Sequence, residues 1–163
     1  MKKFYALFLF LFIGSRLFAQ NLTVLERQII QAKPEEMVRM VMDHSLEKEL
    51  QRIYSKIELL EVDDVFPEYM AAFPGISEEE CLFIILKVAI VSALGSGDEY
   101  GIENAFDILD FCEEIDSMII EDYLQLPEDV RALMESPYWQ DCIAFYRIFD
   151  PEVFFRERFP EYY

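Results

Sequence analysis

Carboxylates are the most abundant side chains in this chain that could do chemistry, and some of them recur at helical spacing. The 163 residues include 32 Asp and Glu, 14 Lys and Arg, and one His. Between residues 102 and 126, acids recur three, four and seven positions apart with no lysine between them. These acids are Glu103, Asp107, Asp110, Glu114 and Glu121. Because like charges at such spacings repel one another along a helix, the pattern predicts an acidic face that binds a basic partner protein.

Other kinds of chemistry find few suitable residues. His44 is the only histidine, so it is the only histidine that could act as general base for a serine or cysteine nucleophile. One histidine is also too few for a histidine-based zinc site. Gly95-Ser96-Gly97 lacks the lysine of a phosphate-binding loop. The acidic turn at residues 98–104 lacks the ligand spacing of an EF-hand. We therefore expect no enzymatic activity and no cofactor, and at most weak binding of divalent cations.

Two alternatives to a binding role remain open. Glu135-Ser136 resembles the catalytic Glu-Ser dipeptide of helical lytic transglycosylases, which use one glutamic acid as the proton donor. The resemblance covers two residues, and Pro137-Tyr138-Trp139 stands where that family has a segment with glycine and Met-Gln. It implies a carboxylate-based cell-wall enzyme with Glu135 as its acid. The other alternative is a cation-binding or purely structural secreted domain.

The C-terminal part, residues 127–163, is rich in aromatic side chains. Aromatic rings usually belong to a core, but an exposed group of them marks a docking surface. The candidate aromatic patch comprises Tyr138, Trp139, Phe155, Phe159, Tyr162 and Tyr163. Three basic residues lie in the same part of the chain, and we expect Arg147, Arg156 and Arg158 to pair with acidic helices across the bundle.

The first 20 residues have the layout of a cleavable signal peptide. Lys2 and Lys3 precede the apolar run 4–13, and Ala19 is a small residue where a signal peptidase can cut. The run is shorter than a membrane-spanning helix, although an uncleaved anchor is the alternative. No cysteine lies near the cut to receive a lipid. We therefore expect a bacterial protein that is periplasmic or secreted, with no membrane span after cleavage.

Cleavage makes the remaining chain more acidic. Removal of Lys2, Lys3 and Arg16 leaves 11 basic against 32 acidic residues, which takes the net charge from −18 to −21. Such a surface repels nucleic acid and attracts basic proteins. The plain alternative is that the charge only keeps the domain soluble.

Three cysteines remain in residues 21–163. Cys81, Cys112 and Cys142 all lie in apolar helical surroundings, where a free cysteine behaves as a small buried hydrophobic residue. We expect three buried thiols, with one disulfide as the alternative in an oxidising compartment.

Apolar periodicity predicts one all-α domain over residues 21–163. The central helix spans 81–94, is apolar nearly all round, begins at a Ser77–Glu80 capping box and ends at Gly95 and Gly97. A long helix over 35–61 and an amphipathic segment over 102–126 flank it. The remaining segments are a short helix over 21–33, a connector with a short helical turn over 62–76, and helices over 127–135, 137–149 and 151–158. The sequence thus predicts a bundle of about six to seven helices around a buried central helix.

Overall fold

The computed structural model describes residues 22–59 and 62–163, which form helices joined by short turns, with no β-strand among them. In chain order the elements are α2 Val24–Gln31, α3 Pro34–Met42, the 3-10 turn η1 His44–Leu46, α4 Glu47–Leu59, α5 Val62–Ala72, α6 Glu78–Ser96, α7 Glu99–Asp116, α8 Ile120–Gln125, α9 Glu128–Met134, α10 Pro137–Ile148, α11 Pro151–Arg158 and the 3-10 turn η2 Pro160–Tyr162. The all-α prediction is confirmed. The described residues contain ten α-helices, more than the sequence predicts, because two of the predicted helices are broken and the predicted connector over 62–76 contains a helix of its own. The predicted signal peptide lies outside the described residues.

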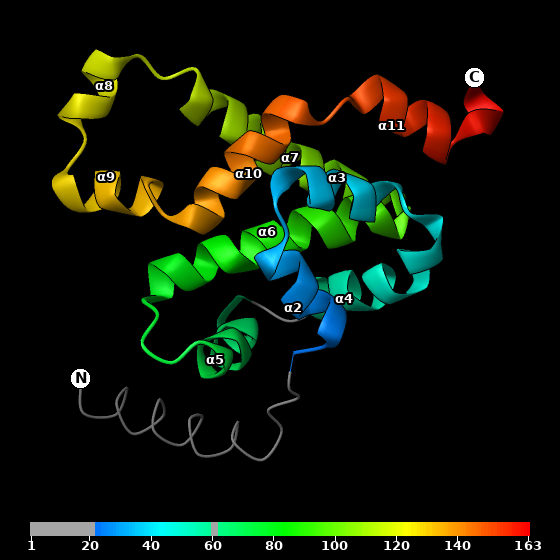
Figure 1. Ribbon diagram of the computed structural model, residues 1–163, viewed down its shortest axis with the longest axis horizontal. Coiled ribbons are helices and arrows are strands. Elements are labelled where there is room, and N and C mark those ends of the chain that lie inside the picture. The colour runs from blue at the N-terminus through cyan, green and yellow to red at the C-terminus, as the bar shows by residue number, and fades with distance from the viewer. Residues whose placement is uncertain (1–21, 60–61) are drawn as a thin grey trace.

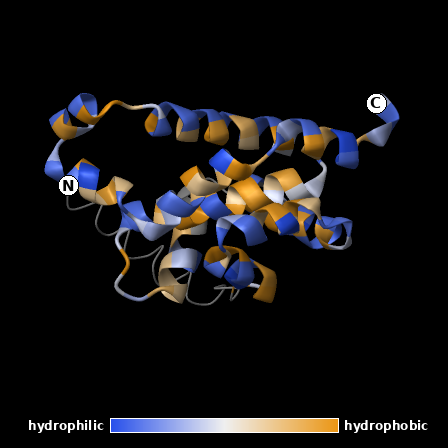
Figure 2. Cartoon of the chain, turned by 45° about the horizontal axis from the view of Figure 1, so that its top comes forward, coloured by the Kyte–Doolittle hydropathy of each residue, from blue (hydrophilic) through white to orange (hydrophobic). Residues whose placement is uncertain are grey.

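Helix α6 lies at the centre of the fold, as predicted (Figure 1). It packs against α2, α3, α4, α5, α7 and α10, and its residues from 87 to 96 are all buried. Figure 2 shows hydrophobic residues concentrated on the helices in the middle of the molecule. The Ser77 hydroxyl accepts the amide of Glu80 at the start of α6 (3.1 Å), which confirms that half of the predicted capping box.

The two glycines near the end of α6 have different structural roles. The helix continues through Gly95 and ends at Ser96, so the prediction that Gly95 terminates it is wrong. A Cβ at Gly95 would lie 2.3 Å from Leu50 Cδ1, so this glycine lets α4 approach α6 closely. Gly97 has φ 70° and supplies the left-handed residue that ends the helix.

The predicted helix over 35–61 is wrong as a single element. It divides into α3, η1 and α4 at Asp43, whose backbone is extended (φ −83°, ψ 98°). The Asp43 carboxylate accepts the amide of Ser45 at 2.9 Å and its hydroxyl at 2.6 Å. A local bond of this kind competes with helical hydrogen bonding, so the chain turns although the apolar spacing continues.

The segment over 102–126 also divides, into α7 and α8. The core positions Ile102, Ala105, Leu109 and Cys112 of α7 are buried as predicted. Ile119, predicted to extend that core face, is exposed because α7 ends at Asp116. Helices α8 and α9 contain no buried residue and form an arm that projects from one end of the molecule (Figure 1).

The remaining predictions concern the connector over 62–76 and the C-terminal helices. The connector over 62–76 contains an 11-residue helix, α5, rather than a short helical turn. The three predicted C-terminal helices are confirmed as α9, α10 and α11. The Asp150 carboxylate accepts the Val153 amide (3.1 Å) and caps α11. Across residues 22–59 and 62–163, none of the helices has the length and apolar character needed to cross a membrane.

Candidate functional site

Helix α7 presents a row of carboxylates to solvent. All members of the row are exposed, and they follow one another at spacings of four, three and four residues. We name this row the acidic face: Glu103, Asp107, Asp110 and Glu114. Within the described residues no member of the acidic face forms an ion pair. Glu121, the fifth residue of the predicted row, is exposed on α8 and therefore does not share this helical face.

The packing of α7 fixes the direction of its acidic face. The helix buries its apolar side against α6 and α10, which leaves the opposite side in solvent. At its start the Asp98 carboxylate accepts the Gly101 amide (2.9 Å) and caps the first turn. Gly101 allows the Tyr54 ring to lie close to the α7 backbone, since a Cβ there would be 2.8 Å from Tyr54 Cε1.

A shallow hollow of about 530 Å³ lies along one edge of the acidic face. Its apolar floor comes from α7 and from the junction between α10 and α11: Phe106, Leu109, Phe149 and Pro151. The floor rings belong to a larger aromatic stack. Phe106 stacks on Phe155 (centroids 5.7 Å apart, planes at 9°), and Phe149 stacks on Phe145 (5.1 Å, 19°). Phe155 and Phe145 therefore hold the two floor rings in position.

The rim of the hollow is polar and carries net negative charge. It comprises Asp110, Glu113, Tyr146 and Arg147. Arg147 Nε lies 3.0 and 3.1 Å from the two carboxylate oxygens of Asp116, so its charge is already compensated. Burial and the neighbouring Glu113 carboxylate raise the pKa of the Tyr146 phenol, which stays a neutral hydroxyl. The two rim carboxylates, Asp110 and Glu113, form no ion pair within the described residues.

The candidate aromatic patch does not form one surface. Trp139 is 1% exposed and packs between Phe83 and Phe111 (centroids 5.3 and 5.5 Å away), so its assignment to an exposed patch is wrong. Tyr138, Phe155 and Phe159 are half-buried against the core. Only Tyr162 and Tyr163 of the patch are exposed, at 79% and 76%.

One lysine is fully buried, which the sequence did not lead us to expect. Lys87 of α6 is 0% exposed. Its Nζ donates to the carbonyl oxygens of Ile30 (2.9 Å) and Ala32 (2.7 Å) and to Asp141 Oδ2 (2.8 Å). Because carbonyls at a helix end lack partners within the helix, Lys87 completes the end of α2 and joins it to α10. A lysine in the middle of an otherwise apolar helix was the signal for this role.

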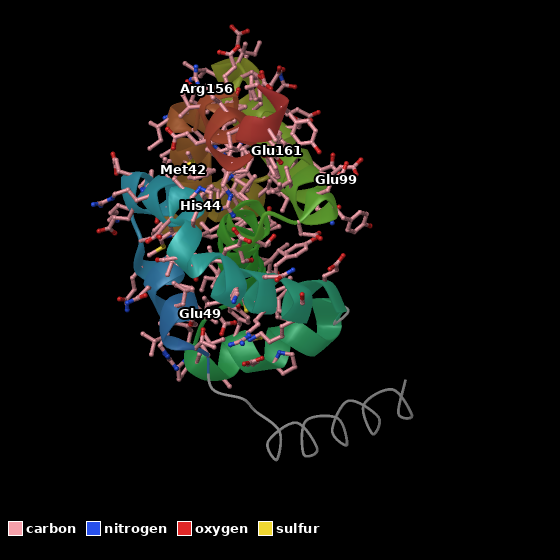
Figure 3. The ribbon with its side chains drawn as sticks, turned by 90° about the vertical axis from the view of Figure 1, so that its right-hand side faces the viewer. Met42, His44, Glu49, Glu99, Arg156 and Glu161 are labelled. Carbon is pink, nitrogen blue, oxygen red and sulfur yellow. The ribbon has the colours of Figure 1, made fainter. Side chains whose placement is uncertain are left out.

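A second buried cation joins α11 to the end of α6 and to the segment that begins α4. Arg158 of α11 donates through Nη2 to the carbonyl of Gly95 in α6, and its Nη1 lies 3.0 Å from His44 Nδ1 and 3.5 Å from Glu47 Oε2. Figure 3 shows His44 at this end of the molecule, beside the segment that carries Arg156 and Glu161. Pairing of Arg147 and Arg158 with carboxylates is thus confirmed, whereas Arg156 forms no ion pair in the described part of the chain.

A buried carboxylate holds α2 to the helices below it. Glu26 is 0% exposed and accepts the Thr23 amide (2.7 Å), Lys56 Nζ (2.6 Å) and the Tyr69 hydroxyl (2.9 Å). Burial raises the pKa of Glu26, but the bonds from Lys56, Thr23 and Tyr69 together outweigh burial and hold it below the usual value. Lys56 also pairs with Glu68 at 3.2 Å, where burial dominates and raises the pKa of that carboxyl.

The remaining candidate residues lie apart from the hollow. Glu135 is exposed at the end of α9, where its carboxylate accepts the Tyr123 hydroxyl (3.1 Å). The adjacent Ser136 hydroxyl is buried and has no hydrogen-bond partner within the described residues. In those residues no group of three or more His, Cys, Asp or Glu is placed to hold a metal ion. The enzymatic role of Glu135 and weak cation binding both stay predictions.

The three cysteines are free and buried, as predicted. Burial raises the pKa of the Cys81 thiol to about 11 and that of Cys112 to about 12, and it raises the pKa of Cys142 as well. All three therefore remain thiols rather than thiolates at neutral pH, the form that packs as a small hydrophobic group.

No protein-family model, curated protein or solved structure matches this chain.

Proposed function

We propose that this protein is an exported, non-enzymatic interaction module of the bacterial envelope that binds a basic partner protein through the acidic face of α7. The observation that carries the proposal is the row of four exposed carboxylates without a cationic partner in the described residues. Export is supported by the layout of the first 20 residues, and the final location is then the periplasm or the medium.

The charges of the acidic face oppose one another in the free protein. The row contains three neighbouring like-charge pairs, and each costs an isolated helix about 0.2 to 0.5 kcal/mol. The whole row therefore costs roughly 1 kcal/mol, which a surface of lysine or arginine side chains would relieve. Because exposed charges are screened by salt, binding through this face weakens as ionic strength rises.

A lysine-rich helical peptide tests the proposal without a known partner. We expect the protein to bind a synthetic lysine-alanine peptide at about 0.05 M salt, and to bind it at least roughly tenfold more weakly at about 0.5 M salt. Neutralising the acidic face should abolish most of this binding. The variant carries Glu103→Gln, Asp107→Asn, Asp110→Asn and Glu114→Gln.

The matched control removes the same number of charges elsewhere. It replaces four exposed acids that also form no ion pair in the described residues: Glu35→Gln, Glu49→Gln, Glu157→Gln and Glu161→Gln. We expect this control to bind the peptide nearly as well as the unmodified protein. Equal weakening of the variant and the control would contradict the proposal, because binding would then follow net charge rather than the acidic face.

A further inference from the structure

The acidic face and the hollow beside it share a residue, which makes them one continuous surface. Asp110 belongs to the carboxylate row and also to the rim of the hollow. Phe106, Asp110 and Glu113 follow one another at spacings of four and three on α7, so they lie along one strip of the helix. That strip separates the buried side of α7 from the acidic face.

The chemistry of the hollow is defined by an apolar floor under a negative rim. Two phenylalanine rings and a proline form much of the floor, and two uncompensated carboxylates stand at the rim. The one rim cation, Arg147, is held by Asp116. The volume of about 530 Å³ falls within the range of sites that hold organic groups. The matching occupant combines an apolar group with a nearby positive charge.

We propose that the hollow is the anchor site for one apolar side chain of a basic, amphipathic segment of the partner protein. An aromatic or leucine side chain packs on the floor formed by the adjacent rings of Phe106 and Phe149, whose centroids lie 6.2 Å apart. Basic residues on either side of it pair with Asp110, Glu113 and the acidic face. This inference rests on the proposed function and deepens it, because it states the kind of segment that the acidic face recognises.

The floor is ready to receive such a side chain before the partner arrives. The stacking of Phe106 on Phe155 and of Phe149 on Phe145 fixes the floor rings in position. A preformed site loses little conformational freedom on binding. The apolar contact is also insensitive to salt, so a partner with an anchor should retain part of its affinity where salt screens the charges.

Two peptides that differ at one position test the inference. Both are lysine-rich helices of equal charge, and one carries a central Phe where the other carries Ala. We expect the Phe peptide to bind the protein roughly tenfold or more tightly, since it buries an aromatic side chain. Phe106→Ser should remove that advantage. The matched control, Tyr100→Ser, changes an exposed aromatic residue of α7 outside the hollow and should keep it.

The outcomes separate the inference from the proposed function. If both peptides bind equally well and Phe106→Ser has no effect, the anchor site is overturned while the acidic face stands. If neither peptide binds at low salt, both proposals are overturned. Should phenethylamine alone bind as tightly as the Phe peptide, the hollow would be a site for a small organic cation, and the anchor inference would be wrong.

A measurement on the unmodified protein covers the case in which Phe106→Ser fails to fold. In the amide spectrum we expect the Phe peptide to shift the signals of Tyr146 and Phe149, on the far side of the hollow from α7, and the Ala peptide to leave them in place. Shifts confined to α7 with both peptides would refute occupation of the hollow.

Discussion

Replacement of the buried Lys87 by methionine tests the most distinctive feature of the core. The methionine side chain has a similar length but cannot donate a hydrogen bond. The substitution therefore leaves Asp141 without its cation and removes the donor from the carbonyls of Ile30 and Ala32. We expect a large loss of stability with no change in helical content at low temperature.

The size of the loss follows from these three contacts. Removing one partner of a buried ion pair costs about 3 to 5 kcal/mol. The Asp141 side chain is 19% exposed, so water partly compensates it and favours the lower end of that range. Each carbonyl that loses its donor adds about 1 kcal/mol. The expected total is about 5 kcal/mol, which for a domain of this size lowers the melting temperature by roughly 10 to 20 °C.

Thermal and urea unfolding followed by circular dichroism measure this loss. Lys48→Met is the matched control, because Lys48 is exposed on α4 and forms no ion pair in the described residues. Asp141→Asn should cost less than Lys87→Met, since the two carbonyls keep their donor. A Lys87→Met protein that melts within about 2 °C of the control would refute the reasoning.

Three further outcomes follow from the fold. Gly95→Ala introduces a Cβ 2.3 Å from Leu50 Cδ1, so urea unfolding should show a loss of about 1 to 3 kcal/mol; unchanged stability would mean that α4 moves away freely. The raised thiol pKa values of Cys81 and Cys112 should make alkylation of the folded protein at about pH 8 slow, with full labelling only in denaturant. The pKa of Glu26 is lower in the folded state than its unfolded value of 4.5, so its contribution to stability is present above that pH and is lost as the pH falls through the folded pKa. Glu26→Gln should therefore flatten the fall in stability between about pH 6 and about pH 3, and an unchanged slope would contradict this assignment.

Helices whose ends are marked by local chemistry could be predicted from the sequence. Proline occupies the first helical position of α10 and of α11, and Ser77 caps α6. The acidic face was also predictable, because the spacing of its four carboxylates is a property of one helix. These features depend on residues a few positions apart, which a sequence displays directly.

The wrong predictions arose where a single contact decides the structure against the periodicity or composition of the sequence. The apolar spacing of the 35–61 segment is the same on both sides of Asp43, so periodicity alone could not reveal that its carboxylate binds the Ser45 amide and turns the chain. Trp139 is aromatic and amphipathic, and only the positions of Phe83 and Phe111 on two other helices decide that it is buried.

The hollow could not be predicted for the same reason. Phe106 and Phe149 lie far apart in the sequence and meet only because α7 and α10 pack together. The acidic face was therefore visible as a row of charges, while the apolar floor that gives it a specific occupant depends on the tertiary structure.

The bond between Arg158 and the carbonyl of Gly95 affects when the protein can finish folding. The two residues are 63 positions apart, so a growing chain that has released all of α6 still lacks the cation for the end of its central helix. Domains generally fold as units during synthesis, and this end of the core is complete only after residue 158 has emerged. Until residue 158 is made, the core is incomplete and the chain is not fully folded. Such a chain can still pass through a membrane channel, as the proposed export requires.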